Sequence, residues 1–175
     1  MALIKPVRGF TPKIGKNVWM ADTATVIGDV EIGDDCSIWF NAVVRGDVNS
    51  IRIGKNVNIQ DGCVLHTSYE TSVIEMGDNV SVGHNAIIHG AKIEKNVLIG
   101  MGAVVLDNAV IGENSIIAAN AVVTKNTIVE PGSLYAGIPA KKIKDVSPEQ
   151  TRDMIQKISN NYRMYASWYE DDSEK

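Results

Sequence analysis

The residues best suited to chemistry in this chain are its three histidines. His66, His84 and His89 are the only histidines among 175 residues, and all three fall in one short stretch. A neutral imidazole is a common ligand for divalent metal ions, and three imidazoles leave an open position for water or substrate. The histidines therefore predict a metal site, provided that the fold brings them together.

The aliphatic residues indicate which elements position these histidines. Ile and Val number 21 and 20, against only 5 Leu. β-Branched side chains suit a pleated surface, whereas Leu is a favoured helix residue. The composition therefore favours β-structure and excludes a helical bundle.

An apolar residue recurs every six positions over most of the chain. The series is Ile14, Met20, Val26, Ile32, Ile38, Val44, Ile53, Ile59, Leu65, Met76, Val82, Ile88, Ile93, Ile99, Val105, Ile111, Ile117, Val123, Val129 and Tyr135. A small residue follows four positions later in 17 of these 20 cases, including Cys36 and Cys63, which are interpreted as packing residues. One large and one small inward residue in every six predict an all-β fold, a parallel β-helix of hexapeptide repeats with just under seven triangular coils.

The six-residue series shifts in three places, and all three surround the histidines. It shifts by three residues before Ile53, by five before Met76 and by minus one after Ile88. Regular coils need no shifts, so each shift predicts a loop or a local contraction near the metal site.

The repeat assigns each histidine to a coil and a face. His66 and His89 occupy equivalent positions on consecutive coils, so we expect their Cα atoms about 5 Å apart on one face. His84 belongs to another face, too far from the pair to share an ion within one chain. In a homotrimer, however, His84 of one subunit would face His66 and His89 of its neighbour, giving three equivalent sites.

Charged residues stand in the same columns one coil below. Arg45 and Asp47 lie below His66, and Asp61 lies below His84. If the two faces meet across subunits, Arg45 can pair with Asp61 and Asp47, which would hold the interface and orient the ligands. The alternative is a plain surface ion-pair cluster.

The motifs Arg45-Gly46-Asp47, Asn58-Ile59-Gln60-Asp61, His66-Thr67, Gly83-His84 and His89-Gly90 together resemble the γ-class carbonic anhydrases over essentially the whole chain. The resemblance implies a left-handed β-helix and a homotrimer. It implies that His66, His84 and His89 are the metal ligands, with His84 donated across the interface, and that Arg45, Asp47 and Asp61 are interface charges. It also implies that Gln60 and Asn58 position the hydroxide or the carbon dioxide, and that Tyr162 reaches towards the site. Gln60 as an interface hydrogen bonder and Tyr162 as a packing residue are the alternatives.

The implied reaction is the reversible hydration of carbon dioxide to bicarbonate by a metal-bound hydroxide. Zn²⁺ suits three imidazoles, and Fe²⁺ and Co²⁺ are alternatives. One feature departs from the archetype of the family, because the glutamate-bearing loop expected after Asp47 is replaced by Val48-Asn49-Ser50-Ile51. Glu70 and Glu75 are candidate substitutes for the missing proton shuttle, and slow turnover is one consequence.

Two other functions fit parts of the same sequence. A hexapeptide acyltransferase using coenzyme A is suggested by the segment at residues 135–141, Tyr-Ala-Gly-Ile-Pro-Ala-Lys. That enzyme needs one histidine as general base, not three around a shared point. The missing acidic loop also leaves open a metal-binding scaffold or assembly subunit with little hydratase activity.

The remaining features predict the domain organisation and location of the chain. Residues 1–145 are expected to form the β-helix domain, and residues 146–175 a helix and acidic tail packed on it. Ser147 and Pro148 predict the start of this helix. Its packing stripe is expected to contain Ile155, Ile158, Tyr162 and Tyr165. A net charge of −4 without a basic run gives no support for nucleic-acid binding. The sequence contains no long apolar stretch of the kind that forms a secretory signal or a membrane span, so a cytoplasmic location is expected.

Overall fold

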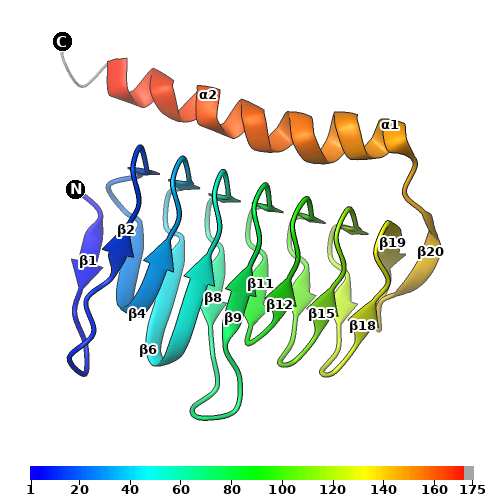
Figure 1. The fold of residues 1–175 in the computed structure, drawn as a ribbon, viewed down its shortest axis with the longest axis horizontal. Helices are drawn as coiled ribbons and strands as arrows, with labels where there is room; N and C mark the ends of the chain where they lie inside the picture. Colours follow the sequence, from blue (N-terminus) through cyan, green and yellow to red (C-terminus); the bar gives the residue numbers. More distant parts are fainter. Residues whose placement is uncertain (172–175) are drawn as a thin grey trace.

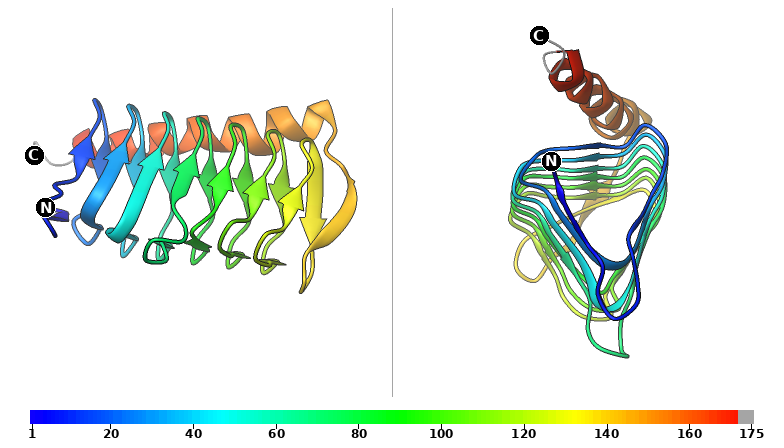
Figure 2. Two further views of the ribbon diagram at one scale, coloured as in Figure 1. Left: turned by 60° about the horizontal axis from the view of Figure 1, so that its bottom comes forward. Right: turned by 90° about the vertical axis from the view of Figure 1, so that its left-hand side faces the viewer.

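Short strands and tight corners alternate along the chain and wind it into a prism of triangular cross-section (Figure 1, Figure 2). The computed structural model describes residues 1–171. Successive coils pair in parallel, so each strand lies beside its counterpart in the coil before and the coil after. The expected hexapeptide-repeat β-helix of about seven coils is thereby confirmed.

The strands form three faces, which we call A, B and C. Face A contains β1 (Leu3–Lys5), the first parts of β4 (Thr25–Ile32) and β6 (Val43–Ile53), β8 (Val64–His66), β11 (Ile87–His89), β14 (Val104–Val105) and β17 (Val122–Val123). Face B contains β2 (Lys13–Ile14), the last parts of β4 and β6, β9 (Ile74–Met76), β12 (Lys92–Ile93), β15 (Val110–Ile111) and β18 (Ile128–Val129). Face C contains β3 (Trp19–Met20), β5 (Ser37–Ile38), β7 (Asn58–Ile59), β10 (Ser81–Val82), β13 (Leu98–Ile99), β16 (Ile116–Ile117), β19 (Ser133–Ala136) and β20 (Lys141–Asp145), the last strand running antiparallel.

The core of the prism is the six-residue series itself. Eighteen of its twenty side chains are buried, and Ile14 and Met20 at the amino-terminal end are partly buried against the same cluster. Cys36 and Cys63 are buried too, and burial raises the pKa of each thiol to about 12. Both cysteines are therefore packing residues, as the sequence indicated.

Asparagine builds the corners of the prism. Among residues 1–171, thirteen non-glycine residues have a positive φ, and ten of them are Asn. Asn tolerates this left-handed conformation better than most residues because its short side chain can hydrogen-bond locally. At one corner the amides of Asn56, Asn79, Asn96 and Asn114 also bond from coil to coil, at 2.9–3.2 Å. This ladder keeps the coils in register.

The carboxy-terminal helix runs back along the outside of the prism (Figure 1). It begins as expected, with Ser147 as N-cap and Pro148 in the first turn of α1 (Pro148–Gln150), and continues through a π-helical turn η1 (Thr151–Gln156) into α2 (Lys157–Asp171). The most buried positions are Ile155, Ser159 and Ala166. Of the expected stripe, Ile155 is buried and Ile158, Tyr162 and Tyr165 are half-buried, so this stripe faces the prism. The acidic tail at 172–175 lies outside the described residues.

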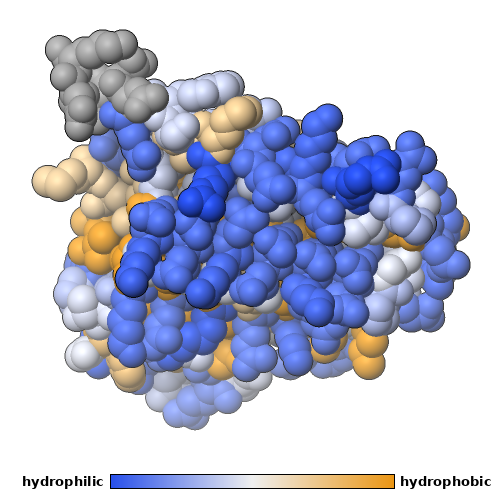
Figure 3. Space-filling model, turned by 45° about the horizontal axis from the view of Figure 1, so that its top comes forward, coloured by the Kyte–Doolittle hydropathy of each residue, from blue (hydrophilic) through white to orange (hydrophobic). Residues whose placement is uncertain are grey.

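The three faces differ in what they present outwards. On face A, five β-branched residues stand side by side in register across consecutive strands, namely Val43, Val64, Ile87, Val104 and Val122. On face B the corresponding row alternates in charge, with Lys13, Glu31, Arg52, Glu75 and Lys92 in register. Seen from the side that carries α2, the surface is mostly hydrophilic, and hydrophobic side chains gather near the end where the termini lie (Figure 3). Face A is therefore the face suited to burial against another subunit.

Candidate metal centre

His66 and His89 lie side by side at the edge of face A. Each is the last residue of its strand, β8 and β11, and the two are partners in the parallel ladder, as the repeat predicted. Their rings meet with centroids 5.2 Å apart, and Nδ1 of His66 lies 3.2 Å from Nε2 of His89. Leu65 and Ile88, the residues before them, point into the core and are fully buried. Packing beneath the pair therefore fixes where the two imidazoles stand.

The spacing of this pair suits a metal ion. Two nitrogens bound to one Zn²⁺ at 2.0–2.1 Å with a tetrahedral angle are about 3.3 Å apart. The observed separation of 3.2 Å between the two ring nitrogens is close to that value. Partial burial, and then the nearby charge of Arg45, lower the pKa of His66, which favours the neutral ring that a metal requires. Both geometry and donor chemistry therefore fit a divalent ion.

Every histidine in the chain contacts an aspartate. Nε2 of His66 lies 3.1 Å from Asp47, and Nδ1 of His89 lies 2.9 Å from Asp107. In both cases the contact uses the ring nitrogen that faces away from the other histidine. A carboxylate on the outer nitrogen fixes the tautomer and the orientation of a metal-binding imidazole. The pair is thus held in the arrangement typical of metal ligands.

His84 lies at the opposite edge of face A, on the corner between β10 and β11. Its Nδ1 is 2.8 Å from Asp61, and its Nε2 is 3.3 Å from the hydroxyl of Tyr162 on α2. Within residues 1–171 of a single chain, no group of three or more His, Cys, Asp or Glu side chains is arranged to hold a metal ion. The structure therefore brings together two of the three expected ligands and separates the third from them.

Tyr162 and Trp39 form an aromatic wall beside His84. The two rings meet edge to face with centroids 5.2 Å apart, and they line a hollow together with Asp61, Tyr165 and Trp168. Burial, and then the charge of Asp61, raise the pKa of Tyr162 to about 12. Tyr162 therefore stays protonated at neutral pH and can donate a hydrogen bond next to His84.

Asn58 and Gln60 form a buried amide chain behind His84. The amide of Asn58 donates to Ser81 at 2.7 Å, Gln60 donates to Asn58 at 3.0 Å, and the backbone N–H of His84 donates to Gln60 Oε1 at 3.2 Å. Both side chains are buried. Each amide is occupied within the chain, so this arrangement holds the backbone of His84 in place.

Arg45 and Asp47 form an ion pair directly below His66. The guanidinium lies 2.7 Å from Asp47 Oδ2, while Oδ1 faces His66. Burial opposes ionisation of Asp47, but the hydrogen bonds from Arg45 and His66 outweigh it and keep the pKa of the carboxyl below its usual value. Asp47 is therefore negative at neutral pH and can accept a hydrogen bond from the outer nitrogen of His66.

Sequence reasoning missed Asp107. Its Oδ1 accepts hydrogen bonds from Ser68 at 3.0 Å and Ser72 at 2.7 Å, in addition to its contact with His89. Burial disfavours the charged form, but the bonds from Ser72, Ser68 and His89 prevail and lower the pKa of Asp107. Asp107 comes one residue after Leu106, which takes the position equivalent to His89 in the next coil, so the repeat gave no direct signal for it.

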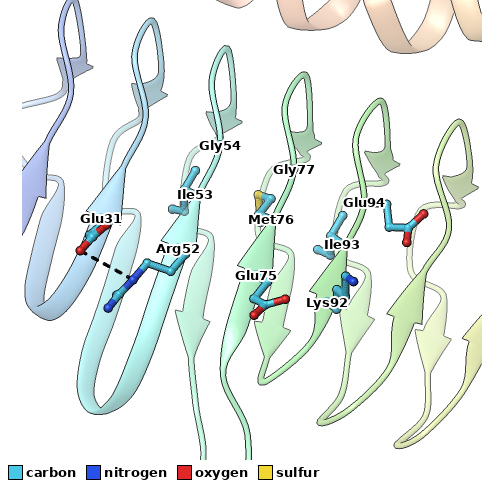
Figure 4. Close-up of a pocket in the computed structure, with 10 residues that line it drawn as sticks. All are labelled: Glu31, Arg52, Ile53, Gly54, Glu75, Met76, Gly77, Lys92, Ile93 and Glu94. Carbon is cyan, nitrogen blue, oxygen red and sulfur yellow. Dashed lines mark ion pairs between the residues drawn. The ribbon is translucent and has the colours of Figure 1, made fainter.

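The two candidate proton-shuttle residues lie apart. Glu70 is exposed at the tip of the loop between β8 and β9, which projects from the prism (Figure 2). Glu75 lies on face B beside Lys92, in a shallow hollow that also contains Glu31 and Arg52 (Figure 4). No histidine lines that hollow. Glu75 thus belongs to the charged row of face B, and Glu70 is the glutamate carried by the loop that follows His66.

Among residues 1–171, no helix is long and apolar enough to cross a membrane.

Comparison with known proteins gives relatives named as carbonic anhydrases and others named as hexapeptide transferases. The family model described as bacterial transferase hexapeptide (six repeats) matches residues 11–46 and 90–125. A carbonic anhydrase of Geobacillus kaustophilus is 46% identical over 167 residues, covering 95% of this chain and 91% of the relative. The mitochondrial gamma carbonic anhydrase 2 of Arabidopsis thaliana is 38% identical over 155 residues, or 86% of this chain and 56% of the relative.

Solved structures of other proteins match nearly the whole fold. The crystal structure of a putative acetyltransferase of Bacillus cereus superposes with a TM-score of 0.92 at 41% identity, and 96% of each chain is covered.

Proposed function

This chain belongs to the γ-class carbonic anhydrase family, and from that premise we propose that it hydrates carbon dioxide reversibly to bicarbonate at a metal site shared between subunits of a homotrimer. One observation supports the proposal most directly. A ring nitrogen of His66 faces a ring nitrogen of His89 at 3.2 Å, and the other nitrogen of each ring contacts an aspartate. The third ligand is His84 of the adjacent subunit.

The placement of the half-sites supports a three-fold assembly. His66 and His89 stand at one edge of face A, and His84 stands at its other edge. A face with complementary half-sites at its two edges can close into a ring, because each subunit offers the pair to one neighbour and His84 to the other. The five in-register Val and Ile side chains of face A lie between these edges and would be buried in such a ring.

The protein's own residues prepare the site for the ion and the substrate. Asp47, Asp61 and Asp107 each contact one ring nitrogen of a histidine, and the other nitrogen of each ring would bind metal. On His84 that nitrogen is Nε2, which lies 3.3 Å from the Tyr162 hydroxyl, so the ion would take the place of this contact. When bound, Zn²⁺, or alternatively Fe²⁺ or Co²⁺, lowers the pKa of a water molecule to about 7 and so supplies hydroxide at neutral pH.

Substrate and proton are handled by groups around that ion. Tyr162 donates a hydrogen bond beside His84, where it can orient carbon dioxide or bicarbonate. Asn58 and Gln60 act indirectly, by fixing the backbone of His84. Glu70, exposed on the loop after His66, would pass the released proton to solvent.

Metal content and hydration rate test the proposal together. We expect protein purified without added metal to hold about one divalent ion per chain, and the Zn²⁺- and Fe²⁺-loaded forms to hydrate carbon dioxide in a stopped-flow assay. Elemental analysis measures the first quantity and a pH indicator measures the second. A trimer that cannot be loaded with metal contradicts the proposal. A loaded trimer without hydration activity supports the scaffold function instead.

Replacing Tyr162 by Phe tests the role of its hydroxyl. We expect Tyr162→Phe to keep the metal and to lower kcat/KM for hydration about 5- to 30-fold, because a hydrogen bond of about 1–2 kcal/mol is lost. Tyr165→Phe is the matched control, since Tyr165 lies three residues away on the same helix and is expected to leave kcat/KM unchanged. Equal rates for wild type and Tyr162→Phe would reduce Tyr162 to a packing residue.

The hexapeptide acyltransferase remains the alternative enzyme. The putative acetyltransferase of Bacillus cereus at 41% identity is the observation that favours it. An acyltransferase base would be a single histidine, whereas His66 and His89 here face each other at 3.2 Å. Saturable binding of acetyl-coenzyme A in a calorimetric titration would favour the transferase, and no heat of binding is expected.

A further inference from the structure

Asp107 connects the metal centre to a loop that projects from the prism. The side chain is buried, with one carboxylate oxygen towards His89 and the hydroxyls of Ser68 and Ser72. The second oxygen lies 3.4 Å from Nζ of Lys125. These partners come from three separate parts of the chain, namely the loop at residues 67–73, the end of β11 and the turn after β17.

The cluster is tightly packed. The backbone N–H of Ser68 donates to the hydroxyl of Ser72 at 3.1 Å, so the loop is also closed on itself. Gly90, next to His89, has a φ of +61°, and a Cβ placed there would lie 2.6 Å from the carboxylate of Asp107 and 2.5 Å from Cβ of Ser72. The absence of a side chain at Gly90 is therefore what allows Asp107 and Ser72 to meet.

Asp107 differs from the other two aspartates that hold histidines. Its side chain is 10% exposed, against 26% for Asp47 and 42% for Asp61. Because it is the most buried of the three, its hydrogen bonds are the least weakened by competition with water. It also bonds the loop through Ser68 and Ser72, so one carboxylate oxygen serves both the histidine and the loop.

We propose that Asp107 is a positioning residue that fixes the ring of His89 and holds the 67–73 loop closed beside the metal site, so that metal affinity and loop order depend on the same carboxylate. The part of this proposal that treats His89 as a metal ligand rests on the proposed function. An acceptor at Nδ1 of His89 keeps a proton on that nitrogen and leaves Nε2 free to face Nδ1 of His66. Glu70 lies on the same loop.

Two substitutions separate the two roles. Asp107→Asn removes the charge from both contacts, whereas Ser72→Ala removes two loop contacts, to Asp107 and to the backbone N–H of Ser68, and leaves the carboxylate facing His89. Asp29→Asn is the matched control, because Asp29 is a partly buried aspartate that pairs with Arg52 at 2.8 Å and touches no histidine. Zn²⁺ affinity is measured by competition with a chromogenic chelator. Loop opening is measured by the rate of chymotrypsin cleavage after Tyr69 in the metal-free protein.

Each variant has a distinct expected result. Asp107→Asn should weaken Zn²⁺ binding about 10- to 100-fold, as loss of an outer hydrogen-bond partner of a ligand does, and should raise the cleavage rate about 5- to 30-fold. Ser72→Ala should raise the cleavage rate while Zn²⁺ affinity falls by less than in Asp107→Asn. Asp29→Asn should match wild type in both measurements.

The outcomes distinguish this proposal from the proposed function. Wild-type Zn²⁺ affinity in Asp107→Asn overturns the positioning role, provided that the wild-type protein itself binds Zn²⁺. An unchanged cleavage rate in Asp107→Asn overturns the coupling to the loop. A wild-type protein that binds no Zn²⁺ contradicts the proposed function, while the cleavage assay still decides the loop. If Asp107→Asn does not fold, the double variant Ser68→Ala, Ser72→Ala decides the loop, and cleavage at the wild-type rate overturns it.

Discussion

Mixing two inactive variants, His66→Ala and His84→Ala, should restore about one quarter of the wild-type hydration activity. In a shared site, His66 and His89 come from one subunit and His84 comes from the next. A one-to-one mixture supplies an intact pair half of the time and an intact neighbouring His84 half of the time, so about one quarter of the sites are complete. Each variant alone should lose more than about 100-fold in metal affinity, because losing a ligand costs more than losing its outer partner. Co-refolded trimers and a stopped-flow assay measure the recovery.

The control for this experiment is the mixture of His66→Ala with His89→Ala. Both substitutions damage the same half-site, so no arrangement of subunits assembles a complete site and no recovery is expected. Val104→Asp, introduced into both variants of the first mixture, should also remove the recovery by placing a charge in the apolar row of face A. A first mixture that stays inactive, although wild type is active after the same refolding, would contradict a site shared between subunits.

The pairing of His66 with His89 could be predicted because it follows from the repeat alone. An apolar residue at every sixth position assigns each residue to a coil, and the ladder partner of His66 is then His89. The same reasoning located Asp61 below His84, where the backbone N–H of Asn85 donates to the carbonyl of Asp61. Side-chain direction in a strand alternates strictly, so a register known from the sequence also gives the outward residues.

Asp107 could not be predicted in the same way. The coil that starts at His89 is shortened, since Ile88 pairs with Val105, and Leu106 therefore takes the position equivalent to His89. Asp107 falls on the corner that follows, where the repeat does not define a direction. Its orientation depends on Ser68 and Ser72, which reach it only after the 67–73 loop has folded.

The helix shows a similar limit. Ser147 and Pro148 predicted its start correctly, because a cap is a local signal. The stripe of Ile155, Ile158, Tyr162 and Tyr165 also faces the prism, but the deepest positions after Ile155 are Ser159 and Ala166. Residues three and four apart share one face of a helix, so the spacing predicts the face but not which of its residues lie deepest.

The stability of the prism should depend on the inward row and not on the outward row, even for the same residue type. Ile111 and Ile128 lie on neighbouring paired strands of face B, but Ile111 is fully buried and Ile128 is 71% exposed. We expect Ile111→Ala to lower the free energy of unfolding by about 2–5 kcal/mol, through lost burial and the cavity left behind. Ile128→Ala should change it by less than about 0.5 kcal/mol.

Urea unfolding of both variants at one protein concentration, without metal, makes this comparison. Neither residue lies on face A, so changes in assembly should not contribute to the difference between them. Because each coil contacts only its neighbours, a cavity at Ile111 weakens the stack at one level and the loss appears in the unfolding of the whole prism. Equal destabilisation by the two substitutions would mean that the six-residue series does not define the core, and the assignment of the histidines to their coils would fail with it.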